Sequence, residues 1–219
     1  MHRMTLGKMQ NPVRGFIHGG AAVAAIVGTI FLLFRTPTWP ARIAIIVFGL
    51  GFVALYLTSS LYHAVPWREA WNDRMQRADH SMIFVLIAAS YTPILAILFE
   101  GSVRWAALAV VWGIAAVGIG QKVLFPKVHM AFSITLMVTM GWLGLSIMWP
   151  LAERAGLSAA ILALAGGTLY TVGMVFLVTG WPRLWPRVFS HHEVFHVFTV
   201  LAGALHFAMV WRYIVPLAA

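Results

Sequence analysis

Seven apolar runs, each long enough to cross a lipid bilayer as an α-helix, recur along the chain. They cover residues 16–34, 43–64, 79–99, 103–121, 128–149, 157–179 and 190–211. The connections between the runs are short and carry prolines, and tryptophans lie near several run ends, as is typical of turns and of the membrane–water boundary. The pattern predicts an all-α membrane protein, a seven-transmembrane helix bundle that forms one domain over residues 1–219.

The composition favours the same environment. Of the 219 residues, 61% are hydrophobic and 10% are charged, a balance that a water-soluble domain of this length could not bury in one core. The absence of cysteine excludes disulfides, thiolate metal sites and cysteine nucleophiles. The formal charge of +9 comes from basic residues scattered singly between the runs, which favours contact with membrane lipid headgroups and no nucleic acid partner.

The first apolar run follows Arg3, Lys8 and Arg14, an arrangement that resembles a secretory signal peptide. The run is long enough to span the bilayer, however, and Arg35 and Pro37 close it without a small-residue cleavage site. We therefore expect it to remain as the first membrane span.

The lysines and arginines divide unequally between the two sides of the predicted bundle. An odd number of crossings places the termini on opposite sides, so the two sets of loops can be compared. Of the 15 basic residues, ten fall on the amino-terminal side: Arg3, Lys8, Arg14, Arg68, Arg74, Arg77, Lys122, Lys127, Arg183 and Arg187. The other side carries five: Arg35, Arg42, Arg104, Arg154 and Arg212. This predicts a cytoplasmic amino terminus and an outside carboxyl terminus in the cell's inner (plasma) membrane.

Ionisable side chains are costly inside a bilayer, so those at the ends of the runs are candidates for function. The second run ends with Ser59 and His63, the third opens with Asp79, and the seventh holds His192 and His196. Because successive spans alternate in direction, the end of the second and the starts of the third and seventh all face the amino-terminal side. These side chains are therefore expected at one depth.

His192 and His196 are four residues apart, so on a helix both imidazoles project from one face and can reach one metal ion. For this pair alone, the alternative is two interfacial histidines bonded to backbone or headgroups. With His63 at the same depth, three neutral imidazoles and a water would form a four-coordinate Zn²⁺ site with an open position. The sequence thus predicts zinc bound by His63, His192 and His196.

Two neighbouring residues have both a structural and a functional interpretation. Asp79 is the cap of the third helix or a partner of Arg77 or Arg74, or else its carboxylate holds the metal-bound water and takes its proton. It could also bind zinc directly and close the site. Ser59 is an ordinary helix serine bonded to a carbonyl, or a donor that approaches the metal centre from one turn before His63.

The remaining polar residues of these runs are expected to play other parts. Glu193 points about a quarter-turn from His192, and we expect it at the surface or against headgroups. His206 lies ~15 Å above His196, too deep to share the ion, so we expect it to line a cavity or bond a neighbouring helix. Five histidines without a partner at helical spacing are expected to be interfacial or packing residues: His2, His18, His80, His129 and His191.

At these residues the chain resembles the progestin and adipoQ receptor family, and within it the bacterial hemolysin III branch. The resemblance covers essentially the whole chain in the number and spacing of the spans. It is carried by Ser59-x-x-x-His63, by Asp79 opening the third span, and by His192-x-x-x-His196 opening the seventh. It implies a seven-helix protein with the amino terminus inside, whose three histidines bind zinc near the cytosolic side with the serine and aspartate close by.

The resemblance also bears on function. The long amino-terminal extension of the animal receptors is absent, so hormone recognition is not expected, while His206 matches a further histidine of the last span. Alkaline ceramidases, more distantly similar, share the Ser, Asp and His arrangement, which implies lipid amide hydrolysis. The name hemolysin III implies cytolysis, which for a chain of seven apolar spans would follow indirectly from altered lipids.

Three functions follow from these observations. The leading one is a zinc-dependent hydrolase with Asp79 as base and Ser59 orienting the oxygen, acting on a lipid amide or ester that enters sideways from the inner leaflet. The main competitor is a non-catalytic sensor of lipid state that binds a fatty acid and keeps zinc structurally. A channel or transporter is disfavoured because the first, fourth, fifth and sixth runs show almost no buried charge or polar stripe. A retinal photoreceptor is excluded because the seventh run contains no lysine.

The predicted orientation can be tested with reporter fusions. A reporter that is active only in the cytoplasm should be silent when it is fused after Ala219 and active when it is fused before Met1, because the basic residues hold the amino-terminal side inside. Cytoplasmic activity of the carboxyl-terminal fusion would contradict either the orientation or the number of spans.

Overall fold

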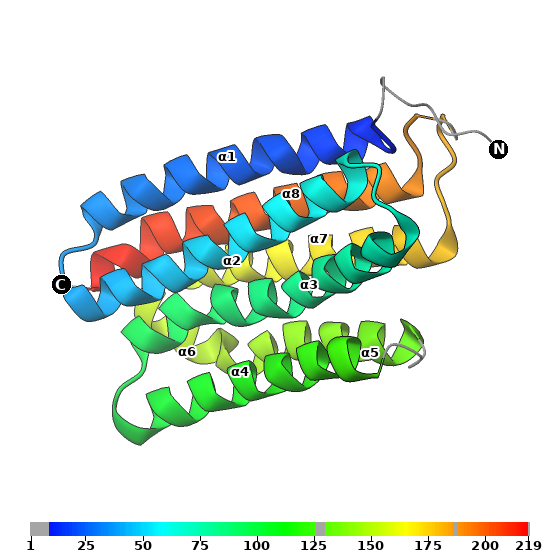
Figure 1. Ribbon diagram of the computed structural model, residues 1–219. Helices are drawn as coiled ribbons and strands as arrows, with labels where there is room; N and C mark the ends of the chain where they lie inside the picture. The colour runs from blue at the N-terminus through cyan, green and yellow to red at the C-terminus, as the bar shows by residue number, and fades with distance from the viewer. Residues whose placement is uncertain (1–8, 126–129, 186–187, 219) are drawn as a thin grey trace.

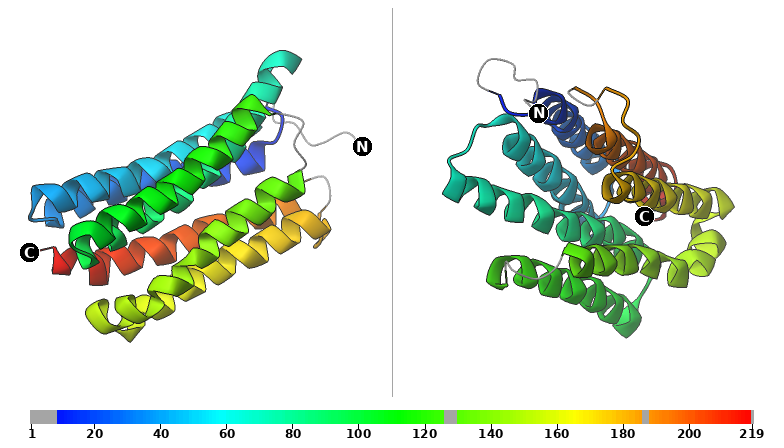
Figure 2. Two further views of the ribbon diagram at one scale, coloured as in Figure 1. Left: turned by 90° about the horizontal axis from the view of Figure 1, so that it is seen from below. Right: turned by 90° about the vertical axis from the view of Figure 1, so that its right-hand side faces the viewer.

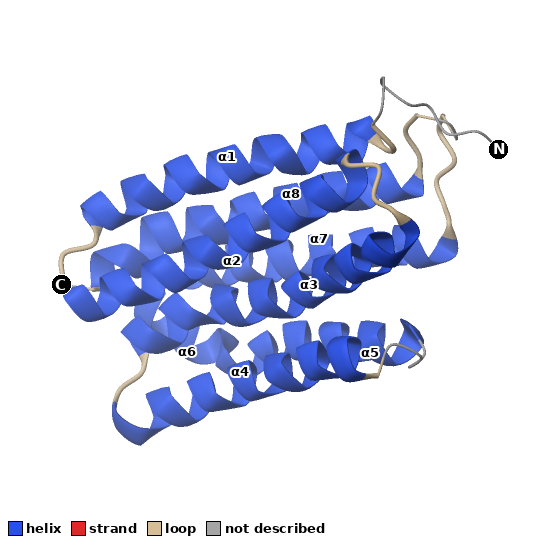
Figure 3. Cartoon of the chain, in the orientation of Figure 1, coloured by secondary structure: helices blue, strands red, loops and turns tan. Residues whose placement is uncertain are grey.

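The computed structural model describes residues 9–125, 130–185 and 188–218. Within these ranges the chain consists of helices joined by loops and contains no β-strand (Figure 3). Among the described residues, seven helical spans are long and apolar enough to cross a membrane. The predicted fold class, an all-α bundle of seven membrane-spanning helices, is confirmed.

The helices keep the order that the apolar runs predict. They are α1 (Pro12–Arg35), α2 (Trp39–Ala64), α3 (Glu69–Leu98), α4 (Gly101–Leu124), α5 (Met130–Trp142), α6 (Met148–Ala155), α7 (Leu157–Thr179) and α8 (His191–Met209). A 3₁₀ segment, Leu143–Ile147, joins α5 to α6, and these three pieces make up the fifth span. After α8 the seventh span continues through a π-helical turn, Val210–Ile214, and a 3₁₀ turn, Val215–Leu217.

Neighbouring spans in the chain are also neighbours in space, and α1 packs against α8 (Figure 1). The spans therefore form a closed ring, which the end-on view of Figure 2 shows. The amino end of α1 and the carboxyl end of the last span lie at opposite ends of the bundle, as an odd number of crossings requires (Figure 1). The side of the membrane that each end faces stays a prediction.

The third helix begins at Glu69, earlier than the apolar run at residue 79 predicts. With 30 residues it is about 45 Å long, which exceeds the ≈ 30 Å hydrocarbon core. Its polar first turns therefore extend beyond the apolar layer, where a hydropathy pattern does not register them. Arg68 occupies the N-cap position, so the interpretation of Asp79 as the helix cap is wrong.

The fifth span is interrupted by the 3₁₀ segment. Such a break frees backbone carbonyls, which must find partners inside the protein because lipid offers none. Tyr91 of α3 provides one: its hydroxyl lies 3.0 Å from the carbonyl oxygen of Met140 and 2.7 Å from that of Gly141 and can donate to either. A hydrogen bond from α3 therefore stabilises the interrupted part of the fifth span.

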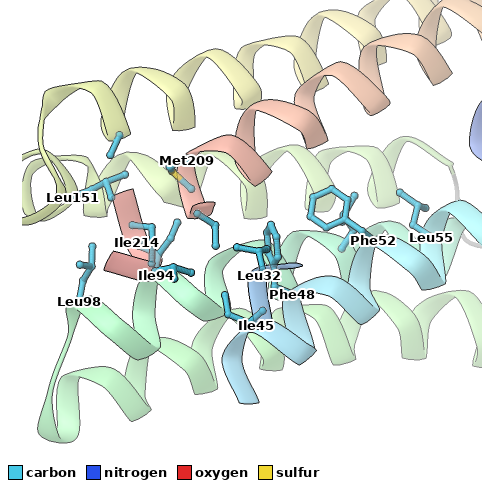
Figure 4. Close-up of a cluster of buried hydrophobic side chains, with 14 of the residues drawn as sticks. Leu32, Ile45, Phe48, Phe52, Leu55, Ile94, Leu98, Leu151, Met209 and Ile214 are labelled. Carbon is cyan, nitrogen blue, oxygen red and sulfur yellow. The ribbon is translucent and has the colours of Figure 1, made fainter. Parts of the chain in front are cut away.

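Apolar side chains inside the ring hold the helices together, and the largest cluster is shown in Figure 4. Leu32 of α1, Phe48 of α2 and Met209 of α8 are at most 1% exposed. Outward-facing residues are apolar as well: Phe34 is 82% and Trp149 79% exposed. Since lipid is as apolar as these side chains, close packing rather than escape from water drives this association.

Candidate metal centre

Three histidine rings meet near one end of the bundle. His63 lies in the last turn of α2, and His192 and His196 lie in the first two turns of α8. Their candidate ligand nitrogens all lie within 4.8 Å of one another, and the ring centroids are 4.9 to 5.1 Å apart. Zinc–nitrogen bonds of about 2.1 Å hold ligands somewhat closer than this. Small side-chain rotations would therefore let the three rings share one ion.

The chemistry of this group suits a metal of the zinc type. Imidazole nitrogens are common zinc ligands, and three protein ligands leave a fourth position open. The Nδ1 atom of His196 is buried and has no hydrogen-bond partner among the described residues. Coordination of a cation is one way in which a buried ring nitrogen is satisfied. No aspartate or glutamate of the described residues joins the group.

Backbone hydrogen bonds fix the end of α2 that carries His63. The last carbonyls of a helix have no partner within it. Here the backbone N–H of Asn11 donates to the carbonyl of His63 at 2.9 Å, and that of Gln10 donates to the carbonyl of Ala64 at 3.3 Å. The chain that leads into α1 therefore caps α2 at the metal centre.

A buried ion pair fixes the start of α8. Arg14 Nε lies 2.6 Å from Glu193 Oε1, with both side chains more than nine-tenths buried. The other carboxylate oxygen, Oε2, accepts a hydrogen bond at 2.8 Å from the backbone N–H of Ser190, the N-cap residue of α8. Loss of one partner of a buried ion pair leaves an unpaired charge and typically costs about 3–5 kcal/mol. The pair therefore holds α1 against α8 beside the histidines.

The expectations that Arg14 faces headgroups and that Glu193 lies at the surface are wrong. α1 begins at Pro12, so Arg14 is in its first turn and packs inward against α8.

A fourth histidine, His18 of α1, lies against the cluster. It is 2% exposed, and its ring centroid is 4.0 Å from that of His196 and 5.1 Å from that of Tyr56. Neither ring nitrogen makes a hydrogen bond of ordinary geometry to a described residue. His18 is expected from the sequence to be an interfacial or packing residue, and it packs against His196. The alternation of spans places it at the depth of the cluster together with four other histidines, so depth alone does not single it out.

Asp79 and Ser59 lie beside the histidines. Both are buried, and their side chains are hydrogen-bonded to each other across α3 and α2. Within the described part of the chain neither Arg74 nor Arg77 forms an ion pair with Asp79, so that interpretation of the aspartate is wrong. Asp79 also lies outside the group whose ligand atoms are within 4.8 Å of one another.

A cavity of about 440 Å³ runs from this cluster into the bundle. Along α8 its wall extends from His192 to Met209, which is about 25 Å of helix. Its polar end includes Ser59, Asp79 and His196, and its far end is walled by apolar residues such as Ile94, Ile147, Met148 and Met209. The volume is typical of pockets for small ligands, and the shape suits a long amphiphile.

The remaining histidines are distributed as follows. His206 lines the cavity and its Nε2 lies 3.2 Å from the carbonyl oxygen of Ala163, so it meets both expectations for it. His80 borders the polar end of the cavity, and His191 lies beside the cluster without joining it. His2 and His129 fall outside the described residues.

A ring of seven membrane-spanning helices, with a cluster of three histidines at one end of a lipid-sized cavity, defines a multi-pass membrane protein with a candidate metal site. The chain belongs to the Haemolysin-III related family, whose model matches residues 7–207.

Characterised relatives cover nearly the whole chain. It is 33% identical to Hemolysin-3 of Bacillus cereus over 221 residues, which cover 100% of this chain and 98% of that protein. It is 32% identical to the Hemolysin-3 homolog of Bacillus subtilis (strain 168), with 90% and 91% covered, and 26% identical to the human monocyte to macrophage differentiation factor, with 91% and 82% covered. The resemblance to the progestin and adipoQ receptor family and its hemolysin III branch is confirmed.

The metal centre predicts which substitutions remove zinc. Purified wild-type protein loaded with zinc should hold about one ion per chain, and His63→Ala, His192→Ala and His196→Ala should each lose most of it, because two imidazoles bind far more weakly than three. Metal analysis of the purified proteins measures this.

His191→Ala is the matched control for these variants, because His191 adjoins His192 in the chain but lies outside the cluster. It should keep its zinc. Retention of zinc by the double variant of His192→Ala and His196→Ala would refute the site.

Proposed function

We propose that this protein is a zinc-dependent hydrolase that cleaves an amide or ester bond of a membrane lipid at the histidine cluster. The position of Asp79 is the observation that carries the proposal. Asp79 borders the same cavity as His192 and His196, two of the three histidines, yet lies outside the group that could surround one ion. This favours an open fourth position, which catalytic zinc sites keep, over a structural site closed by four protein ligands.

The residues around the cluster supply the parts of a hydrolytic reaction. When bound, zinc supplies a Lewis acid that polarises the substrate carbonyl and makes a water molecule acidic. One carboxylate oxygen of Asp79 accepts the proton of the attacking water and then gives it to the leaving nitrogen or oxygen. The hydroxyl of Ser59, bonded to that carboxyl, orients it. One water is consumed, and a carboxylic acid and an amine or alcohol are released.

The cavity provides room for the acyl chain. Beyond the polar end, its walls are formed largely by side chains such as Leu55, Ile83, Met137 and Met209. Apolar walls hold no hydrogen-bonded water, so an acyl chain would enter this space without breaking such bonds. The chain would also exclude bulk water from the reacting carbonyl. A lipid whose first acyl carbon lies at the histidines is therefore a substrate of suitable shape.

Two lining residues indicate how a lipid could enter from the side. Leu145, in the 3₁₀ segment, and Leu164, on α7, border the cavity and are also 55% and 45% exposed. These exposed lining residues support an opening of the cavity toward lipid between the two elements. Gln76, one turn before Asp79 on α3, also borders the cavity and is exposed. Sideways entry from the inner leaflet, at the histidine end, therefore stays part of the proposal.

A sensor that binds a fatty acid carboxylate at the same centre would use the same histidines and cavity. It would differ from a hydrolase in lacking turnover.

The word hemolysin in the relatives' names is compatible with a hydrolase, because released fatty acids and single-chain lipids perturb membranes and could cause lysis indirectly.

Substitution of Asp79 separates metal binding from turnover. Asp79→Asn should keep its zinc, because the aspartate lies outside the three-histidine group, and should lose about 10²–10⁴-fold in turnover, because the amide cannot take the proton. The assay measures fatty acid released by purified zinc-loaded protein from ceramide and from phospholipid.

Asp73→Asn, an exposed position of the same helix, is the matched control and should retain full turnover and full zinc. If wild-type protein holds zinc and binds fatty acid but releases none from either lipid, the hydrolase proposal fails and the sensor is favoured. Loss of zinc from Asp79→Asn would instead place the carboxylate among the ligands.

A further inference from the structure

Tyr170 of α7 and His206 of α8 form a second polar pair on the cavity wall, away from the metal centre. Their rings are edge to face with centroids 5.7 Å apart, and both residues line the cavity. The two helices lie side by side, as Figure 2 shows. His206 comes ten residues after His196, which places it ~15 Å farther along α8.

Two polar atoms of this pair have no hydrogen-bond partner in the described part of the chain. The hydroxyl of Tyr170 and the Nδ1 atom of His206 are buried, and neither makes a hydrogen bond to any described residue. Buried polar groups in proteins are nearly always hydrogen-bonded, and an unsatisfied one carries its full desolvation penalty. In a membrane span the surrounding lipid cannot supply the missing bond. The pair therefore needs a partner that enters the cavity.

The other nitrogen of His206 determines what kind of partner this is. Nε2 lies 3.2 Å from the carbonyl oxygen of Ala163, and a carbonyl only accepts, so Nε2 carries the proton and Nδ1 is an acceptor. Close packing holds the ring in place: a Cβ added at Gly166 would lie 2.5 Å from Nε2. The cavity wall therefore offers one fixed acceptor.

The phenol of Tyr170 can donate a hydrogen bond. An acceptor and a donor on two rings whose centroids are 5.7 Å apart match a hydroxyl group, which donates to His206 Nδ1 and accepts from Tyr170. A carbonyl would satisfy the tyrosine alone, and an alkyl chain would satisfy neither. The chemistry of the pair thus selects a hydroxyl.

We propose that the cavity takes an amphiphile with two polar groups: a carbonyl or carboxylate at the histidine cluster and a hydroxyl near the middle of its chain, bound by Tyr170 and His206. This rests on the proposed function only in placing the acyl head at the cluster. The ligand class is therefore a hydroxylated long-chain acyl compound, and the pair determines specificity rather than reaction.

A competition experiment tests this preference. Zinc-loaded protein is incubated with equal amounts of stearic acid and hydroxystearic acid with a mid-chain hydroxyl, and the two complexes, which differ by one oxygen, are counted by native mass spectrometry. The ratio of hydroxylated to plain acid should be about five- to tenfold higher on wild-type protein than on Tyr170→Phe, as expected for one neutral hydrogen bond. Comparison within one mixture cancels the different solubility of the acids in detergent.

Matched controls isolate the contact. Tyr213→Phe removes a hydroxyl that does not line the cavity and should keep the wild-type ratio. With a hydroxyl placed beside the carboxyl instead, Tyr170→Phe should leave the ratio unchanged. His206→Gln retains a donor toward Ala163 but removes Nδ1, and should lower the ratio as Tyr170→Phe does. If one of these two variants fails to fold, the other still tests the contact.

The outcomes separate the two proposals. Equal ratios on wild type and Tyr170→Phe would mean that no ligand hydroxyl is bound by Tyr170 and His206, and that a buried water or nothing lies there. This result would overturn the inference and leave the hydrolase proposal intact. Binding of both acids that is unchanged in His192→Ala, or no binding at all, would overturn the placement of the acyl head at the cluster and with it both proposals.

Discussion

The bilayer's inability to hydrogen-bond is the constraint on which this structure depends. Each polar group inside the seven-helix ring must find its partner within the protein or in a ligand. Arg14 and Glu193 neutralise each other, and Tyr91 covers the carbonyls freed by the break in the fifth span. The buried polar atoms that still lack protein partners belong largely to residues bordering one cavity, as His196 and His206 do. The constraint thus draws attention to this cavity.

The same constraint explains how the histidines of the candidate metal centre are held in place. Its histidines come from two helices that are not consecutive in the chain, α2 and α8, so their meeting depends on α1 between them. The chain before α1 caps α2 at His63, and Arg14 in the first turn of α1 pairs with Glu193 of α8. α1 therefore holds the ends of α2 and α8 close together. The carboxylate of Glu193 also caps the start of α8, which fixes the direction in which the imidazoles of that helix project. A catalytic constellation requires positioning of this kind.

Much of this arrangement follows from the sequence, because hydropathy and the alternation of spans are one-dimensional properties. They locate the spans and put His63, Asp79, His192 and His196 at one depth. They do not register helix outside the apolar layer, which is why α3 begins before Asp79 and why the aspartate is not a cap. Nor do they specify which helix α1 touches, so the inward turn of Arg14 and the contact of His18 with His196 were beyond them. Those features depend on packing between distant segments.

The central claim is that three histidines from α2 and α8 hold one zinc ion with an open position inside the bundle. X-ray absorption at the zinc edge of purified, zinc-loaded protein measures the ion's surroundings directly. The account predicts three imidazole nitrogens at about 2.0–2.1 Å and one further light ligand from solvent or substrate. A shell of oxygens without imidazole scattering, or one that is unchanged when His63 is replaced by alanine, would contradict it.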